Sequence, residues 1–236
     1  MQVNSNYNSI SFSSLRCPIK PFTIKTPKGT LYCREMDYKT IYRNRFYRKL
    51  GQFFLDIFAE TSSHPFWAKC RKATLDKKTY DDYIASTVSD YKKFFVDPDT
   101  TVIFAKDKRS RIVGAIQARK LNLNSIVKDE DTLYVDSLAV LPKYRGNDVG
   151  KTLLEKVLKA SKYRFSQVFL VAYKESAPFY EKLGFERMNP KDSAQKFAIK
   201  KLSDIRIDYP EYADYMQKDL EKTLPDKWFE RIEKNN

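Results

Sequence analysis

Apolar side chains recur at helical spacing in the first quarter of the chain, at Phe46, Leu50, Phe53, Phe54, Ile57 and Phe58. Intervals of three and four residues place them on one face of a helix, and such a stripe is more often core than a ligand site. A second helix is predicted over residues 80–95, before the turn at Asp97-Pro98-Asp99.

From residue 101 onward the apolar period shortens towards two, which is typical of strands. The turn at Asp107–Ser110 joins two of these segments into a hairpin. Further helices are predicted over residues 150–160 and, after the strand at 167–172, through Lys182. The predicted strands are Leu31–Met36, Thr101–Ala105, Arg111–Leu121, Thr132–Val140, Gln167–Ala172 and Ala194–Leu202. Strands and helices therefore interleave around a mixed sheet, an α/β or α+β architecture.

The two ends of the chain differ from its middle. Residues 1–30 contain no Asp or Glu, and Pro18, Pro21 and Pro27 disfavour a helix, so we expect a poorly ordered or loosely docked arm. Residues 203–236 carry nine acidic and six basic side chains, and we expect a helical C-terminal extension split at Pro225. The folded domain is thus expected at residues 31–202.

The net charge of +14 over 236 residues suggests either a lysine-rich solvated surface or a surface for a polyanion. Nucleic acid is one such partner, although no compact basic run marks it. The acidic C-terminal extension could pair with the basic body within one chain or across a homodimer.

Histidine and cysteine are too few for several kinds of site. His64 is the only histidine, and Cys17, Cys33 and Cys70 are widely spaced. We therefore expect no metal, no zinc ribbon and no disulfide framework, as in a cytoplasmic protein with reduced thiols. No run of 18 apolar residues occurs, so we expect no membrane-spanning helix.

The segment from Asp136 to Leu154 predicts a strand, a turn containing glycine and then a helix. Such a turn presents backbone N–H groups at a helix N-terminus, where the helix dipole favours a phosphate. Gly150-Lys151-Thr152 matches the end of a P-loop, but Arg145 occupies the place of its first glycine, which argues against a P-loop.

A different phosphate-binding motif fits better. Leu138-Ala139-Val140, Pro142, Tyr144-Arg145-Gly146 and Gly150 resemble the acetyl-CoA-binding motif of the GNAT N-acetyltransferase superfamily, whose core is R/Q-x-x-G-x-G/A. Downstream, the FYEKLGF segment at 179–185 resembles the second signature of that superfamily. The resemblance covers residues 31–202 and implies a mostly antiparallel sheet that splays between the fourth and fifth predicted strands.

The resemblance also implies an activity and a set of roles. Acetyl-CoA would be the cosubstrate, with pantetheine added along the free edge of the fourth strand and the Leu138 amide facing the thioester carbonyl. Tyr180 would protonate the departing thiolate, since a tyrosine hydroxyl keeps its proton at neutral pH. The residues implied to bind acetyl-CoA are Leu138, Ala139, Val140, Arg145, Gly146, Asn147, Asp148, Val149, Gly150, Lys151, Ser176 and Phe179.

Two positions depart from the family pattern. The fourth motif position is Asp148, whose carboxylate either repels a pyrophosphate or turns away to cap the following helix, with Arg145 and Lys151 offsetting its charge. Tyr173 stands where many members have an asparagine that contacts pantetheine, and Ser176 is a weak substitute for it.

The acceptor side is less defined. Asp136 is either the general base or a structural acid, and His64 is either a base in an acceptor loop or a turn residue. Phe66, Trp67 and Tyr83 are candidate walls of an acceptor pocket. No cysteine lies near either motif, which favours direct attack by a neutral amine over a cysteine-linked intermediate.

These residues predict an acetyl-CoA-dependent N-acetyltransferase that acts on a primary amine in a ternary complex. Two alternatives remain open. One is a module of the same fold that binds acyl-CoA without turnover, suggested by Asp148 and Tyr173. The other is an acetyltransferase whose acceptor amine is linked to RNA, suggested by the basic charge.

Overall fold

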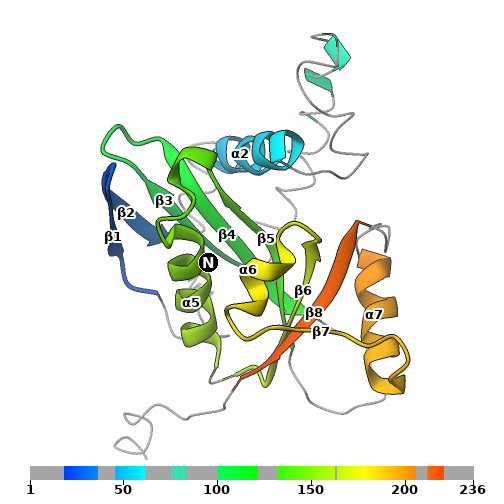
Figure 1. Ribbon diagram of the computed structural model, residues 1–236. Coiled ribbons are helices and arrows are strands. Elements are labelled where there is room, and N and C mark those ends of the chain that lie inside the picture. Colours follow the sequence, from blue (N-terminus) through cyan, green and yellow to red (C-terminus); the bar gives the residue numbers. More distant parts are fainter. Residues whose placement is uncertain are drawn as a thin grey trace, which may run out of the picture.

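A computed structural model describes residues 19–36, 46–61, 100–121, 132–162, 164–205 and 212–220, with a few single positions between 76 and 85. Its centre is an eight-stranded sheet in the order β1-β2-β3-β4-β5-β6-β8-β7 (Figure 1). Neighbouring strands are antiparallel except β5 and β6, which are parallel. The strands are β1 (Phe22–Thr26), β2 (Gly29–Glu35), β3 (Thr100–Lys106), β4 (Ile112–Leu121), β5 (Thr132–Val140), β6 (Gln167–Tyr173), β7 (Glu186–Arg187) and β8 (Ala213–Asp219).

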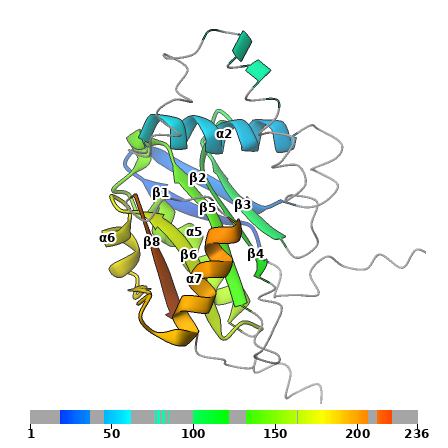
Figure 2. The same ribbon diagram turned by 90° about the vertical axis from the view of Figure 1, so that its right-hand side faces the viewer.

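Helices cover both faces of the sheet (Figure 1, Figure 2). The helices α5 (Val149–Ser161) and α6 (Ala177–Glu181) pack on one face, where the largest apolar cluster contains Leu153, Leu154 and Ile116. On the opposite face lie α2 (Phe46–Thr61) and α7 (Ser193–Ile205). A short 3-10 helix, η1 (Pro142–Tyr144), leads from β5 towards α5. Among the helices in the described ranges, none is long and apolar enough to cross a bilayer.

The predicted fold class is confirmed, and most predicted elements are observed. The apolar stripe from Phe46 to Phe58 packs against the sheet: Leu50 and Phe54 are fully buried, and Phe46 contacts Phe104 with ring centroids 4.7 Å apart. This confirms its interpretation as core. The second predicted helix at 80–95 lies almost entirely outside the described residues.

Part of the predicted N-terminal arm belongs to the sheet. Residues 22–30 are not a loose arm, because β1 pairs with β2 from Phe22↔Cys33 to Thr26↔Gly29 and Ile24 is buried. Proline excludes a helix but not an edge strand, and here Pro21 precedes the strand and Pro27 lies in the turn that follows it. Residues 1–18 lie outside the described part of the chain.

Two elements near the C-terminus differ from their predictions. The segment 194–202 forms helix α7 rather than a strand, because Ala198 and Leu202 lie one helical turn apart and both are buried. Within the expected helical extension, residues 213–219 form strand β8. Tyr215 and Met216, which are adjacent in β8, pack on opposite faces of the sheet, as successive residues of a strand do. The region around Pro225 is not among the described residues.

Candidate functional site

Strands β5 and β6 separate partway along their length. They are paired only from Thr132↔Gln167 to Val135↔Leu170, whereas β5 continues to Val140 with β4 alone as its neighbour. The last five residues of β5 therefore have one edge that is not paired to a strand. This is the splay between the fourth and fifth predicted strands that the sequence led us to expect.

The pairing register identifies which backbone groups face the gap. The N–H of Leu141 donates to the carbonyl oxygen of Val113 at 2.9 Å, so residue 141 points towards β4. Directions alternate along an antiparallel strand, so the polar groups of Leu138 and Val140 point away from β4 and into the gap. The N–H of Leu138 is thus directed as its predicted role requires.

The loop after β5 is held by side-chain contacts to its own backbone. The Nε of Arg145 donates a hydrogen bond to the carbonyl oxygen of Val140 at 3.1 Å. This carbonyl oxygen is one of the backbone groups that face the gap. The Nδ2 of Asn147 donates to the carbonyl oxygens of Tyr144 and Arg145 at 3.3 and 2.9 Å. Both contacts fix the path of the chain before α5 begins.

Two residues of this loop have left-handed backbone conformations, Gly146 with φ of 72° and Asp148 with φ of 54°. Such a φ suits glycine, and aspartate is among the few other residues that tolerate it. The structure therefore explains why the family motif places glycine at the position of Asp148. Asp148 precedes the first residue of α5, but its side chain makes no capping hydrogen bond, so the predicted capping role was wrong.

A cavity of about 480 Å³ opens at the splay, between the end of β5, the N-terminus of α5 and helix α6. A side chain at Gly150 would narrow it, since a Cβ there would lie 3.5 Å from both Phe179 and Val140. The predicted residues that line this cavity are Leu138, Ala139, Val140, Arg145, Gly146, Asp148, Val149, Gly150, Lys151, Ser176, Phe179 and Tyr180. Asn147 does not line it and supports the loop instead.

Tyr180 is held by aromatic packing on α6. Its ring meets Phe179 and Phe185 edge to face, with centroids 5.0 and 5.8 Å away, and the residue is 8% exposed. The three aromatic residues of the FYEKLGF segment thus pack together: Phe179 and Tyr180 line the cavity, and Phe185 packs against the Tyr180 ring from within the core.

Asp136 lies in a second, smaller cavity of about 40 Å³ that shares Leu138, Ser176 and Tyr180 with the larger one. Asp136 is the extra residue of a β-bulge, because Gln117 and Ala118 on β4 face Ser137 and Val135. Arg119 Nη2 lies 3.9 Å from Asp136 Oδ1. The structure thus brings Asp136, Leu138 and Tyr180 around one small space.

The sequence did not identify every residue of the larger cavity. Helix α2 contributes Ile57 and Phe58, and η1 contributes Tyr144. Tyr173 at the end of β6 and Glu175 in the turn after it complete the set. The only available signal for the α2 pair was that the apolar stripe continues to Phe58 at its C-terminal end. The candidate acceptor residues His64, Phe66, Trp67 and Tyr83 lie outside the described residues.

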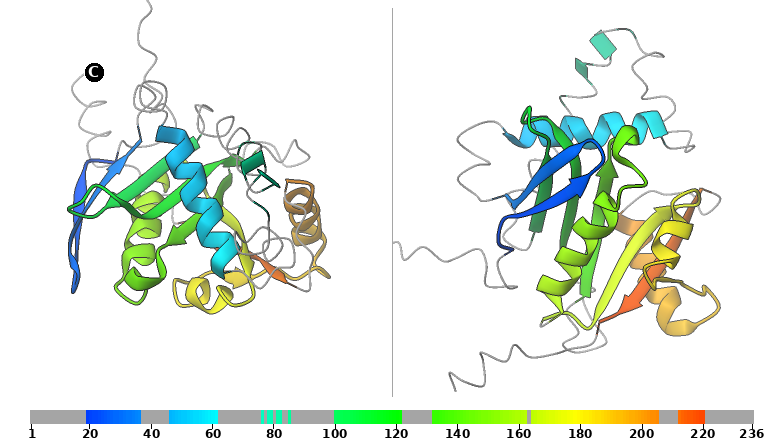
Figure 3. Two further views of the ribbon diagram at one scale, coloured as in Figure 1. Left: turned by 90° about the horizontal axis from the view of Figure 1, so that it is seen from above. Right: turned by 60° about the vertical axis from the view of Figure 1, so that its left-hand side comes forward.

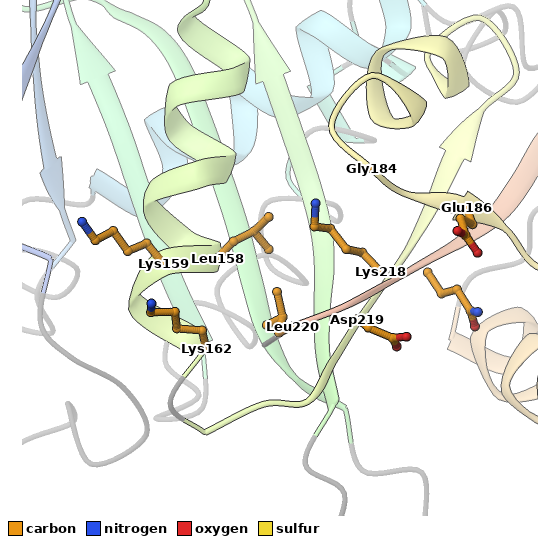
Figure 4. A pocket seen from close by; sticks show the side chains of 9 residues that line it. Leu158, Lys159, Lys162, Gly184, Glu186, Lys218, Asp219 and Leu220 are labelled. Atoms are coloured by element: carbon orange, nitrogen blue, oxygen red, sulfur yellow. The ribbon is translucent and has the colours of Figure 1, made fainter. Parts of the chain in front are cut away.

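Another cavity, of about 620 Å³, lies at the opposite end of α5 (Figure 4). Lys218 borders it, donates to the carbonyl oxygen of Leu183, and pairs through its backbone with Val168. The strands beneath are paired here, so this cavity offers no open strand edge. Its lining residues are Leu158, Lys159, Lys162, Gly184, Glu186, Gln217, Lys218, Asp219 and Leu220.

Comparisons with solved structures find the same overall fold. PaiA N-acetyltransferase from Thermoplasma acidophilum, solved in complex with coenzyme A, superimposes with a TM-score of 0.50 at 16% identity, over 80% of this chain and 98% of that one. The GNAT domain of PAT from S. lividans gives a TM-score of 0.51 at 13% identity, over 85% and 97%. A Corynebacterium glutamicum protein described as "histone acetyltransferase HPA2 and related acetyltransferase" gives a TM-score of 0.51 at 16% identity, over 87% of this chain and 98% of that one.

At these identities the solved structures establish the fold alone, and no curated protein matches the sequence. The family comparison goes further: the profile described as acetyltransferase (GNAT) domain matches residues 69–199, which is more than half of the chain. Together with the splayed strands and the loop before α5, this match shows that the chain belongs to the GNAT acetyltransferase family.

Proposed function

We propose that this protein transfers the acetyl group of acetyl-CoA to a primary amine, by direct attack of the amine in a ternary complex. The observation that carries the proposal is the convergence of Asp136, Leu138 and Tyr180 on one small cavity beside the larger cavity at the splay. A base, an oxyanion donor and an acid are the three groups that such a transfer needs.

The larger cavity fits acetyl-CoA in shape and in chemistry. The gap-facing carbonyl oxygen of Leu138 and N–H of Val140 can bond the amides of pantetheine as a short added strand would. The loop at 145–150 and the N-terminus of α5 favour the diphosphate, and Arg145 and Lys151 add positive charge at the cavity wall.

Bound acetyl-CoA would supply the thioester whose carbonyl is attacked and whose sulfur leaves. The Leu138 N–H would stabilise the negative charge that develops on the carbonyl oxygen. Tyr180 would give its hydroxyl proton to the leaving sulfur, and Asp136 would take the proton of the incoming ammonium, directly or through water.

The described cysteine does not support a covalent intermediate. Burial raises the pKa of Cys33 to about 12, and its side chain belongs to the core beneath α5. A thiol in that state is a poor nucleophile at neutral pH. Cys17 and Cys70 are outside the described residues and far in sequence from both motifs.

A second candidate is a module that binds acyl-CoA without turnover. Two carboxylates, Asp148 and Glu175, line the larger cavity, and negative charge there opposes a diphosphate. An acceptor amine linked to RNA is a narrower form of the enzymatic proposal, motivated by the net charge of +14.

The test combines calorimetry with acetyl-CoA and a thiol-release assay over a panel of primary amines, including an aminoacylated RNA. Binding together with thiol release on at least one amine supports the transferase. Binding without thiol release on any amine supports the module instead. Absence of binding contradicts both candidates.

A further inference from the structure

Among the described residues, no helix covers one face of the outer strands of the sheet. Helix α2 packs on β3, β4 and β5, whereas β1 and β2 lie at the edge of the sheet beyond it (Figure 3). On the other face of these two strands, Ile24, Leu31 and Cys33 are buried under α5. The alternate residues of β1 and β2 therefore face solvent on the side of α2.

A single large aromatic side chain stands in the middle of this open face. Tyr32 is 59% exposed, and it is the more exposed of the two large hydrophobic side chains that reach solvent in the described part of the chain. The registers place it opposite Thr23 on β1 and Lys106 on β3. Its ring is thus presented on a strand that is paired on both sides rather than on a loop.

Cations surround Tyr32 on the same face. Arg34 is two residues along β2, Lys106 is directly opposite on β3, and Lys25 is diagonal to it on β1. The Cβ atoms of same-face neighbours in these positions lie within about 8 Å of the Cβ atom of Tyr32. Among the described residues, no carboxylate forms an ion pair with any of the three.

The positions of two of these cations are set by packing. Arg34 lies over the Phe104 ring with its guanidinium carbon 5.2 Å from the centroid, and Lys106 Nζ lies 4.7 Å from the Phe46 centroid. Desolvation by burial, together with the charges of Arg34 and Lys49, lowers the pKa of Lys106. Like charges are therefore close enough here to reinforce one another's positive potential.

The basic surface continues around the adjoining turns. Residues 19–36 and 100–111 contain eight basic and two acidic side chains. Both acids have partners within the fold: Glu35 accepts from the backbone N–H of Ile19, and Asp107 accepts from Arg111. Lys28, Lys108 and Arg109 line a cavity of about 240 Å³ between the β1–β2 and β3–β4 turns, large enough for a phosphate group.

We infer that the open face of β1–β3 around Tyr32 binds single-stranded nucleic acid, with a base stacked on the Tyr32 ring and phosphates held by Lys25, Arg34 and Lys106. An exposed aromatic residue flanked by cations on a sheet is the arrangement that such binding uses, since every base has a stackable face and every linkage a negative charge. An anionic membrane fits less well, because a membrane-binding surface exposes several large apolar side chains and this face exposes one.

This inference does not depend on acetyl transfer, because none of these residues lines the cavities at the splay. It is tested by fluorescence anisotropy of the full chain with labelled twelve-nucleotide oligo(U) and oligo(dT), between 50 and 400 mM NaCl. Three phosphate-binding cations predict a slope of log affinity against log salt of about −2. Binding of either oligonucleotide supports the surface, and the tighter of the two identifies RNA or DNA as its ligand.

The variants locate the binding. Tyr32→Ala should weaken binding roughly tenfold, as expected for the loss of one stacked base, while Tyr32→Phe should retain it. The double variant Lys25→Glu/Arg34→Glu should abolish most binding and flatten the salt dependence.

Helix α7 offers matched controls. Phe197→Ala removes the other exposed large aromatic side chain, which also has a lysine beside its ring, and Lys196→Glu/Lys200→Glu makes the same change in net charge. Both controls should bind as the unchanged protein does. Thermal unfolding midpoints check that every variant is folded.

Four outcomes would overturn the inference. They are no binding to either oligonucleotide at 50 mM NaCl, equal losses in the α7 controls, full affinity in Tyr32→Ala, and binding of vesicles containing phosphatidylserine in place of oligonucleotides with the same dependence on Lys25 and Arg34.

Discussion

The Nε of Arg145 donates a hydrogen bond to the backbone carbonyl oxygen of Val140, at 3.1 Å. This bond joins the loop before α5 to the free edge of β5. It places a guanidinium group at the wall of the larger cavity and leaves the N–H groups of Leu138 and Val140 directed into the gap. One side chain thus connects the expected diphosphate region to the expected pantetheine region.

We expect Arg145→Ala to weaken acetyl-CoA binding by roughly 10- to 100-fold, the range for a lost hydrogen bond to a charged group. Arg145→Lys keeps the charge but loses the Nε geometry, so its affinity should lie between those of the original protein and Arg145→Ala. Calorimetry with acetyl-CoA, and with acetyl-pantetheine, which has no phosphate, separates the contribution of the phosphates from that of the pantetheine arm. An unchanged affinity for acetyl-CoA in Arg145→Ala would contradict this role.

A second prediction concerns Asp148, which lines the same cavity with a left-handed backbone and without a capping bond. Asp148→Gly removes a negative charge and suits φ of 54°. We expect tighter acetyl-CoA binding, by roughly three- to tenfold at low salt, with a smaller gain as salt screens the charge. Calorimetry at two salt concentrations measures both effects.

Asp148→Asn is the matched variant, because it removes the charge and keeps the size of the side chain. If repulsion dominates, Asn and Gly should tighten binding equally. If the backbone conformation dominates, only Gly should do so. Weaker binding in both variants would show that the carboxylate helps to hold the cosubstrate.

The residues that the sequence named and that line the larger cavity lie in two short, continuous motifs. Arg145, Gly146 and Gly150 lie within six consecutive residues that lead from the loop into the first turn of α5. The FYEKLGF segment comprises the end of α6 and the turn after it, so each motif is nearly complete in itself. Ile57 and Phe58 could not be assigned to the cavity, because a buried helical stripe looks the same in sequence whether it meets only core or also a ligand.

The errors in the fold have a similar cause. Strand β8 lies between β6 and β7, and its buried residues Ala213 and Met216 are three apart, a spacing that suggests a helix. Its extended conformation comes from pairing with β6, a strand more than 40 residues earlier in the chain. Such long-range pairing overrides local pattern and is not visible in a single sequence.

A third prediction concerns Tyr180. Tyr180→Phe removes only the hydroxyl, and the ring should keep its edge-to-face contacts with Phe179 and Phe185. If the hydroxyl protonates the leaving sulfur, kcat should fall by about 100-fold or more, while acetyl-CoA affinity and the unfolding midpoint stay nearly constant. Thiol-release kinetics, calorimetry and thermal unfolding measure the three quantities. A kcat within a factor of two of the original would exclude this role.

The fourth prediction separates the catalytic from the structural interpretation of Asp136. Asp136→Asn should lower kcat by at least tenfold without weakening acetyl-CoA binding, because Asp136 lines only the smaller cavity. The substitution also removes the ion pair with Arg119, and the loss of negative charge beside that guanidinium is a second way in which the variant can perturb the site.

Steady-state kinetics of the double variant Asp136→Asn/Arg119→Gln distinguish the loss of a base from the loss of the ion pair. It removes both charges, so a defect that comes from the unbalanced charge of Arg119 should be relieved. A defect that comes from the missing base should persist. Recovery of kcat in the double variant would therefore assign Asp136 a structural role.

The last prediction concerns the β3–β4 turn and its dependence on pH. Asp107 Oδ1 accepts from the backbone N–H groups of Arg109 and Arg111, and Oδ2 accepts from Arg111 Nε at 2.9 Å. Desolvation by burial raises the pKa of Asp107, but these hydrogen bonds and the charge of Arg111 outweigh it and lower the pKa below its usual value. The ionised carboxylate is therefore favoured in the folded state.

Because the folded-state pKa is below the unfolded one, this stabilisation is present above about pH 4 and is lost as the pH falls through the folded-state value. At pH 7, Asp107→Ala should reduce the free energy of unfolding by roughly 1–3 kcal/mol, since backbone donors lose their acceptor as well. Asp107→Asn keeps an acceptor oxygen and should cost less. Urea unfolding at pH 7 and pH 3 should show the difference between Asp107→Asn and the original chain shrinking in acid, while Glu155→Gln, exposed on α5, should show no such change. A difference that is equal at both pH values would mean that the charge of Asp107 does not stabilise the turn.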